Sequence, residues 1–268
     1  MLRFQTKDIL DYANYSLLSY KELEEVKNLF DSKEDLLINC INCPRYYSGN
    51  TGAQLYILNH KSNLIVVFRG TEEIKDIITD INMKKTKMKL SSHQYPEVHS
   101  GFLNQFMTVE DKINDEIKKY LRENEKERNI IFTGHSLGGA LATLAYCYFN
   151  DKYGNISNMG MVNFGSPRVG GKNFYKLFNK NCKNSIRIVN RYDPVPCLPT
   201  RRKYKHVNKR EWVINKDIKT TVKHRYYWVI KNTILSIFGW GYSSFKDHSC
   251  ENYIEEIKTT MNSLLNQV

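Results

Sequence analysis

The chain has 268 residues, of which 41% are hydrophobic and 25% charged, and this composition excludes a wholly disordered protein. Its formal net charge of +12 favours an anionic partner, either nucleic acid or an acidic membrane surface. Eleven basic and two acidic residues lie between Arg201 and Lys231, so this segment alone carries a net charge of +9.

The first sixteen residues contain acids and no continuous apolar run, so the sequence predicts no secretory signal and a cytoplasmic location. The six cysteines are scattered, which favours the reduced state. Cys40 and Cys43 form one C-x-x-C pair without a second pair, so structural thiols are favoured over a metal site, and no metal or cofactor is expected. Residues 226–245 are the most apolar stretch, but polar residues and glycines interrupt them too often for a membrane span.

Helical and strand-like hydrophobic patterns alternate along the chain. In order they predict helices at 6–20 and 21–31, strands at 53–60 and 63–70, helices at 72–81 and 101–124, a strand at 129–134, a helix at 137–149, a strand at 158–166, a helix at 171–180, a strand at 185–193 and a helix at 252–267. This alternation predicts a single α/β domain over residues 1–268, with a mainly parallel central sheet and helices on both faces.

The stretch TGHSLGGALA at residues 133–142 places Ser136 between a predicted buried strand and a helix. Gly134 and Gly138 flank the serine, as a tight strand-to-helix turn that exposes a nucleophile requires. The N-terminus of the following helix supplies free N–H groups beside the hydroxyl, where an oxyanion would form. The alternative is a serine that caps an ordinary turn, and it stays open at this point.

A nucleophilic serine of this kind needs an acid and a histidine later in the chain. Asp151 lies at the far end of the helix, about 20 Å from Ser136. Asp193 ends a predicted strand at the same sheet edge as Ser136 and is therefore the favoured acid. His248 lies in a loop before the last helix and is the favoured base. Two other histidines follow Ser136, and both lie within the basic segment: His206 and His224.

Six short motifs resemble, in the same order, those of the fungal-type (class 3) lipases of the α/β-hydrolase fold. They are FRGT (68–71), VHSGF (98–102), TGHSLGGALA (133–142), FGSPRVGG (164–171), DPVPCLP (193–199) and DHSCENYI (247–254). The resemblance implies Ser136 as nucleophile, His248 as base and Asp193 as the acid that orients it. It also implies an oxyanion hole formed by Thr71 and the backbone N–H of Leu137.

The implied activity is hydrolysis of lipid esters (triacylglycerol, diacylglycerol or phospholipid) through an acyl-enzyme. The resemblance also implies that residues 72–81, with their stripe of isoleucines, act as a lid, but the same stripe fits a helix packed on the core. HVNKREW (206–212) departs from the family's His-x-Gly-x-Glu-x-Trp, with Asn208 at the glycine position and the glutamate shifted to Glu211. Specificity is therefore least transferable between Trp212 and His248. The stretch at about 201–245 forms a basic, aromatic insertion in the domain.

This insertion favours peripheral contact with an anionic membrane, although a solvated charged face fits equally well. The alternative function is a catalytically idle hydrolase fold that binds lipid or serves as a scaffold. A nucleic-acid partner is not expected, because the basic residues are not accompanied by a recognition fold. The sequence predicts no particular oligomeric state.

Overall fold

A computed structural model of the chain describes residues 4–21, 35–42, 53–60, 63–71, 84–124, 128–190, 193–207, 211–214 and 246–265. The helix expected at 21–31 lies almost entirely outside these residues. The expected lid helix at 72–81, the apolar stretch at 226–245 and His224 lie wholly outside them. Among the described helices, none is both long and apolar enough to cross a membrane.

Apart from the helix expected at 101–124, the predicted helices and strands that fall on described residues are present, and the structure adds four strands that were not predicted. The helices are α1 (Thr6–Leu18), α4 (Ser100–Met107), α5 (Glu110–Glu123), α6 (Leu137–Tyr153), α7 (Lys172–Asn181), the short 3-10 helix η1 (Val195–Cys197) and α10 (Cys250–Leu265). The strands are β1 (Asp35–Asn42), β2 (Gln54–His60), β3 (Asn63–Phe68), β4 (Lys85–Lys87), β5 (Glu97–His99), β6 (Asn129–His135), β7 (Asn158–Phe164), β8 (Ser185–Asn190) and β9 (Glu211–Ile214).

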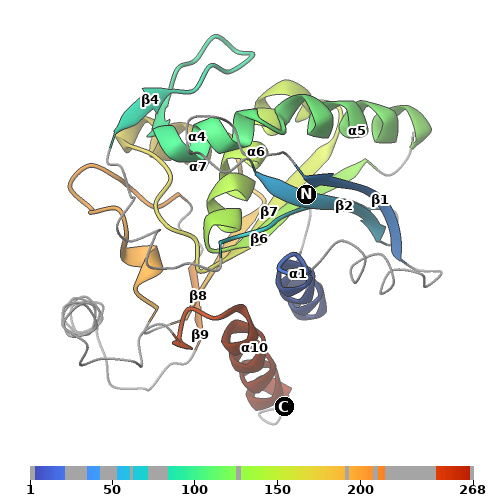
Figure 1. Ribbon diagram of the computed structural model, residues 1–268, viewed down its shortest axis with the longest axis vertical. Coiled ribbons are helices and arrows are strands. Elements are labelled where there is room, and N and C mark those ends of the chain that lie inside the picture. Colours follow the sequence, from blue (N-terminus) through green and yellow to red (C-terminus); the bar gives the residue numbers. More distant parts are fainter. Residues whose placement is uncertain are drawn as a thin grey trace.

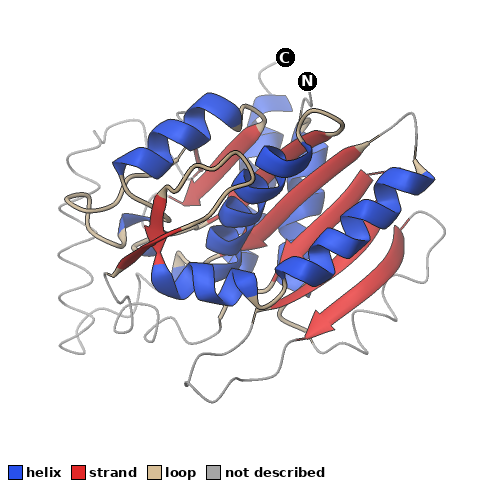
Figure 2. Ribbon diagram, turned by 90° about the horizontal axis from the view of Figure 1, so that it is seen from above, coloured by secondary structure: helices blue, strands red, loops and turns tan. Residues whose placement is uncertain are grey.

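Seven strands form one sheet in the order β1-β2-β3-β6-β7-β8-β9. The first three pair antiparallel, and every pairing from β3 to β9 is parallel. Helices α1 and α10 lie together on one face, and α4, α5, α6 and α7 cover the other (Figures 1 and 2). The predicted mainly parallel sheet with helices on both faces is therefore confirmed, and its parallel strands bring their carboxyl ends to one edge.

Strand β6 lies in the middle of the sheet because its apolar side chains can be buried on both faces. Ile130 and Phe132 belong to the core beneath α4–α7, whereas Ile131 belongs to the core beneath α1 and α10. The next helix, α6, is buried around most of its circumference and packs directly on β6 and β7. Strand and helix are thus both held rigidly on either side of Ser136.

The single long helix expected over 101–124 is wrong, since the chain forms α4 and α5 with a break at Thr108 and Val109. The Thr108 hydroxyl donates to the Gln105 carbonyl (O···O 2.7 Å) and accepts from the Ala53 N–H (3.3 Å). The Thr108 and Val109 amides bond carbonyls three residues back, which tightens and ends the helix. Val109 is fully buried, so the break also fills the core.

A second, smaller sheet lies at one end of the molecule, where β4 pairs antiparallel with β5. Its edge continues through isolated bridges from Val98 to Gly170 and from Gly170 to Lys205. The Tyr204 hydroxyl donates to the Lys84 carbonyl (O···O 3.2 Å) and ties the same two segments together. The start of the basic insertion is therefore attached to the β4–β5 hairpin.

Candidate active site

Ser136 lies at the turn between β6 and α6 with φ 57° and ψ −124°, a left-handed conformation that is strained for a residue with a side chain. Its N–H donates to the Phe164 carbonyl (N···O 2.9 Å), which anchors the turn to β7. A Cβ at Gly134 would lie 2.5 Å from the Gly138 carbonyl carbon, and one at Gly138 would lie 2.2 Å from the Phe68 oxygen. The turn is therefore too tight for any residue but glycine at these two positions.

The structure brings the two expected oxyanion residues to the same edge of the sheet. Phe68 on β3 is in register with Gly134 on β6, and Thr71 and Leu137 each follow this pair by three residues. Leu137 is the first residue of α6, so its N–H has no acceptor within the helix. Both residues are only partly buried. Both residues are therefore placed to donate hydrogen bonds to the carbonyl oxygen of an ester bound at Ser136.

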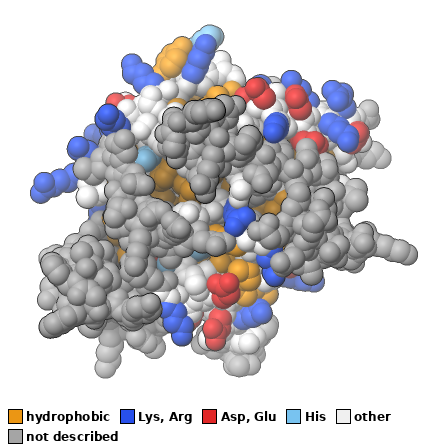
Figure 3. All heavy atoms as spheres, in the orientation of Figure 1, with side chains coloured by type: hydrophobic (Ala, Val, Ile, Leu, Met, Phe, Trp, Pro, Cys, Tyr) orange, Lys and Arg blue, Asp and Glu red, His pale blue; other side chains and the backbone are white. Residues whose placement is uncertain are grey.

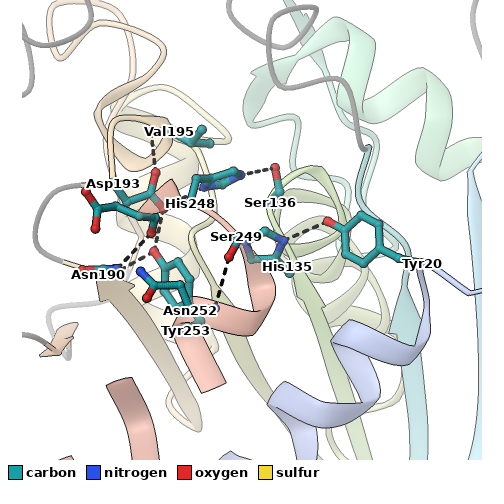
Figure 4. Close-up of polar contacts among 11 residues, drawn as sticks. Tyr20, His135, Ser136, Asn190, Asp193, Val195, His248, Ser249, Asn252 and Tyr253 are labelled. Atoms are coloured by element: carbon teal, nitrogen blue, oxygen red, sulfur yellow. Dashed lines mark hydrogen bonds and ion pairs between the residues drawn. The ribbon is translucent and has the colours of Figure 1, made fainter. Parts of the chain in front are cut away.

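The three residues expected to carry the chemistry form one continuous hydrogen-bonded chain (Figure 4). Ser136 Oγ lies 2.8 Å from His248 Nε2, and His248 Nδ1 lies 2.8 Å from Asp193 Oδ2. Nδ1 carries the proton that the carboxylate accepts, so Nε2 is left to accept from the serine hydroxyl. None of the three side chains is more than 1% exposed. This arrangement can pass a proton from an attacking serine to a histidine.

Asp193 is held by three donors. Oδ1 accepts from the Val195 N–H (2.8 Å), and Oδ2 accepts both from His248 and from the Tyr253 hydroxyl (2.6 Å). The same hydroxyl accepts from the Asn190 N–H (2.9 Å), so Tyr253 joins the end of β8 to the acid. Tyr253 is not among the site residues predicted from the sequence, where its one signal is its place on the helix that follows His248.

Gly165 lets the acid, the histidine and Tyr253 approach one another. It adopts φ +59°, and a Cβ there would lie 2.9 Å from Asp193 Oδ2, 3.1 Å from His248 Cε1 and 3.1 Å from the Tyr253 hydroxyl. Any side chain at this position would be both strained and in collision with the hydrogen-bonded chain. The glycine of FGSPRVGG is therefore part of the site's packing.

The loop that carries Asp193 is fixed through its backbone carbonyls. The buried Arg168 guanidinium donates to the carbonyls of Cys197 and Pro199, the latter at 2.6 Å. His206 lies against the same loop, with Nε2 hydrogen-bonded to the Pro196 carbonyl. His206 is therefore held by a polar contact with the acid loop and does not take part in the triad.

Two further aromatic residues, His135 and Tyr20, continue from His248 on the side away from Asp193. The His135 ring packs against the His248 ring with centroids 4.6 Å apart, and its Nδ1 is 2.8 Å from the Tyr20 hydroxyl (Figure 4). Burial, and secondarily the charge of His248, hold the pKa of His135 well below its ordinary 6.5, so this ring is neutral at pH 7. The Tyr20 hydroxyl also fills the space where a Cβ at Gly70 would lie, next to Thr71.

A further carboxyl group borders the site. Asp247 immediately precedes His248, and its backbone carbonyl accepts from the Asn190 side-chain amide (2.9 Å). Burial, and then the negative charge of Asp193, raise the pKa of Asp247 to about 6. Its side chain therefore changes charge near pH 6. Within the described part of the chain, no group of His, Cys, Asp and Glu residues could hold a metal ion.

Two named proteins are each 30% identical to part of this chain. A phospholipase A(1) of Arabidopsis thaliana, named as chloroplastic, is 30% identical over 152 residues, which are 52% of this chain and 34% of that protein. A secreted mono- and diacylglycerol lipase of Fusarium solani is 30% identical over 166 residues, which are 61% of this chain and 48% of that protein. The aligned part thus spans less than half of each relative.

The expected cytoplasmic location is wrong, because these relatives are named as chloroplastic and as secreted proteins. The expectation rested on the composition of the first sixteen residues and on the scattered cysteines. Neither observation identifies a compartment. Three of the described cysteines, Cys147, Cys182 and Cys250, form no disulfide, and such thiols occur in reducing and oxidising surroundings alike.

Solved structures support the same relationship. The lipase from Rhizopus microsporus var. chinensis has a TM-score of 0.68 and 26% identity, with 81% of this chain and 77% of that chain covered. Lipase II from Rhizopus niveus has a TM-score of 0.64 and 25% identity over 76% of this chain. The family model described as lipase (class 3) matches residues 65–203, just over half of the sequence. With an elbow serine, a buried acid and a histidine joined at one sheet edge, the chain belongs to the class 3 lipase family and has the α/β-hydrolase fold.

Proposed function

We propose that the protein is a serine hydrolase of lipid carboxylic esters, with Ser136 as nucleophile, His248 as general base and Asp193 as the acid that orients His248. The observation that carries this proposal is the unbroken chain of two 2.8 Å contacts from Ser136 Oγ through His248 to Asp193. The left-handed backbone of Ser136 adds to it, since an ordinary capping serine has no need of that strain.

The reaction begins when His248 Nε2 takes the proton of Ser136 and Oγ attacks the ester carbonyl carbon. The carbonyl oxygen becomes negative, and the protonated His248 then gives its proton to the leaving alcohol. The acyl group remains on Ser136. Water attacks this acyl-enzyme, gives its proton to His248 and releases the fatty acid, and Ser136 recovers its proton. Asp193 stabilises the protonated imidazole in both halves.

Thr71 and the Leu137 N–H are proposed as the donors that bind the negative oxygen. Leu137 contributes the free amide of a helix N-terminus, where the helix dipole favours negative charge. Thr71 follows the end of β3 beside the elbow. Removal of one such donor is expected to lower kcat by about a hundredfold. No step needs a metal ion, so treatment with EDTA is expected to leave hydrolysis intact.

The deciding experiment compares hydrolysis of p-nitrophenyl esters of increasing chain length by the wild type, Ser136→Ala and Ser166→Ala. Ser166 is a matched control, because it is also buried but donates only to the Pro167 carbonyl. Ser136→Ala should lose on the order of 10⁴-fold or more in rate, and Ser166→Ala should stay close to the wild type. Equal rates in all three proteins would refute the assignment of Ser136.

Labelling with diethyl p-nitrophenyl phosphate separates catalysis from the idle-scaffold alternative. An activated serine displaces p-nitrophenolate and gains a diethyl phosphoryl group, which mass spectrometry locates on the peptide that contains Ser136. A scaffold without an activated serine would stay unlabelled. Absence of both labelling and turnover, in protein that is folded and given a lipid interface, would favour the scaffold.

The triad side chains are almost completely buried, so a lipid ester reaches Ser136 only after part of the protein moves. We propose that residues 1–268 form a single domain and that the protein contacts anionic membranes peripherally. Lipid class and chain length are left to the ester series above.

A further inference from the structure

A surface of eight basic residues gathers from two segments that lie far apart in the sequence. Four come from the start of the β4–β5 hairpin and four from the start of the basic insertion: Lys84, Lys85, Lys87, Lys89, Arg201, Arg202, Lys203 and Lys205. We call this set the basic surface. Seven of the eight side chains are exposed and Lys85 is half-buried. Lys and Arg side chains follow the upper left of the molecule in Figure 3, where β4 and residues 201–205 lie in Figure 1.

The two segments are fixed together by the backbone. Gly170 lies between them and bridges both to Val98 of β5 and to Lys205. The Lys205 N–H donates to the Gly170 carbonyl (2.9 Å), and the buried Tyr204 side chain reaches the Lys84 carbonyl. The positive charges are therefore held side by side on one small sheet, and do not depend on flexible side chains meeting by chance.

Exposed lysines and buried apolar residues alternate along the first strand of the hairpin and the residues that follow it. Lys87 and Lys89 are exposed, whereas Met88 and Leu90 between and after them are buried. Glu97 is the one acidic residue of the pair β4–β5, and it is hydrogen-bonded to Lys85 (2.8 Å). This hydrogen bond, and the charge of Lys85, lower the pKa of Glu97, as a strongly positive surrounding requires. The eight basic residues thus have one acidic residue among them on the two strands, and a second carboxylate, that of Asp151, contacts Ser92 in the hairpin's turn.

An aromatic side chain projects from the hairpin's far end. Tyr95 is 50% exposed, more than any other large hydrophobic side chain in the described part of the protein, and exposed His93 lies two residues before it. Tyrosine suits the boundary between water and lipid, because its ring is apolar and its hydroxyl is polar. The hairpin therefore combines exposed lysines with one amphipathic ring.

The basic surface is connected along the chain to residues of the candidate active site. The segment that leaves Thr71 returns to the described structure at Lys84, and the loop that begins at Asp193 leads directly to Arg201. Both flanks of the site are thus connected to the positive charges. We propose that the basic surface docks the protein on an anionic phospholipid membrane and brings the site to its substrate, an inference that rests on the proposed lipid-ester hydrolysis.

Vesicle binding by the full-length chain tests this inference. The vesicles are phosphatidylcholine with or without phosphatidylglycerol, and binding is measured by flotation at low and high NaCl. One variant carries Lys87→Gln, Lys89→Gln, Arg202→Gln and Lys203→Gln. The control variant removes four exposed cations from α5, through substitutions to glutamine at Lys112, Lys118, Lys119 and Arg122.

The wild type and the α5 variant should bind phosphatidylglycerol vesicles at low salt and release them at high salt. The variant of the basic surface should bind roughly 600-fold more weakly, since each of the four cations near an anionic membrane contributes about a fivefold factor. Equal loss in both variants, binding that ignores lipid charge or salt, or binding to duplex DNA in place of vesicles would overturn the inference.

Hydrolysis of a soluble short-chain ester separates this inference from the proposed function. All variants should cleave p-nitrophenyl butyrate at the wild-type rate, because none of the substituted residues touches the triad. Turnover without charge-dependent vesicle binding would refute the docking surface alone. Vesicle binding without turnover that depends on Ser136 would refute the proposed hydrolysis alone.

Discussion

Tyr253→Phe removes one oxygen atom that makes two buried hydrogen bonds. The Tyr253 hydroxyl donates to Asp193 Oδ2 (2.6 Å) and accepts from the Asn190 N–H (2.9 Å), and all three residues are fully buried. The carboxylate loses a charged hydrogen bond and the amide is left without an acceptor. Together these losses should lower the free energy of unfolding by about 2–4 kcal/mol.

The same substitution should alter the pH dependence of hydrolysis. Oδ2 of Asp193 shares its negative charge between Tyr253 and His248, so loss of one donor leaves more of that charge facing the imidazole. The protonated form of His248 is then stabilised, and the acidic limb of the kcat/KM profile should move to higher pH by about half a unit to one unit. At pH 8 the rate should fall by about three- to tenfold, because the acid is held less firmly.

Tyr146→Phe is the matched control for this experiment. Tyr146 is buried to the same degree, and its hydroxyl accepts from the Asn184 N–H (3.2 Å) away from the site. Both variants should melt at lower temperature, but only Tyr253→Phe should shift the acidic limb. An unshifted limb in Tyr253→Phe, or an equal shift in the two variants, would refute the positioning role of Tyr253.

Three other substitutions test the surroundings of the triad. Tyr20→Phe removes the hydrogen bond to His135 and should lower kcat by roughly tenfold with little change in KM, as measured by steady-state kinetics on a soluble ester; an unchanged kcat would contradict the role of this pair. Asp247→Asn should raise the melting temperature at pH 8 and not at pH 4. Because burial and the charge of Asp193 raise the pKa of Asp247, the protonated form of Asp247 stabilises the fold at low pH. This contribution to stability is lost as the pH rises through about 6. The lysine of Arg168→Lys cannot donate to two carbonyls of the acid loop as the guanidinium does. The substitution should lower kcat/KM, and it should lower the free energy of unfolding, measured by chemical denaturation, by about 2–4 kcal/mol. Wild-type values of both quantities would show that the guanidinium geometry is unimportant.

The arrangement of the sheet could be predicted because its signals are local. Apolar runs such as β6 and β7, each followed by a turn and a helix, require parallel strands whose carboxyl ends share an edge. That single constraint brings Ser136 and Asp193 together, and the late loop before α10 leaves His248 free to reach them. The sequence therefore predicted which residues meet, although it contained no distances.

The rest of the site depends on contacts that hydrophobic periodicity does not encode. Tyr20 and His135 are 115 residues apart in the sequence, and each fits an ordinary packed aromatic residue when seen alone. Tyr253 lies on the apolar face of an amphipathic helix, where its hydroxyl gives no local signal. The break at Thr108 was missed for a related reason, because a hydroxyl that bonds the backbone leaves the surrounding helical pattern intact.

The backbone conformation of Ser136 also lowers the stability of the folded protein. A residue with a Cβ at φ 57° and ψ −124° costs about 1–3 kcal/mol relative to one that adopts this backbone without strain. Glycine would relieve that cost, so Ser136→Gly should melt above Ser136→Ala even though neither can form an acyl-enzyme. A protein that used this fold only as a passive surface would gain stability by giving up the serine, whereas a hydrolase has to retain a turn that weakens it.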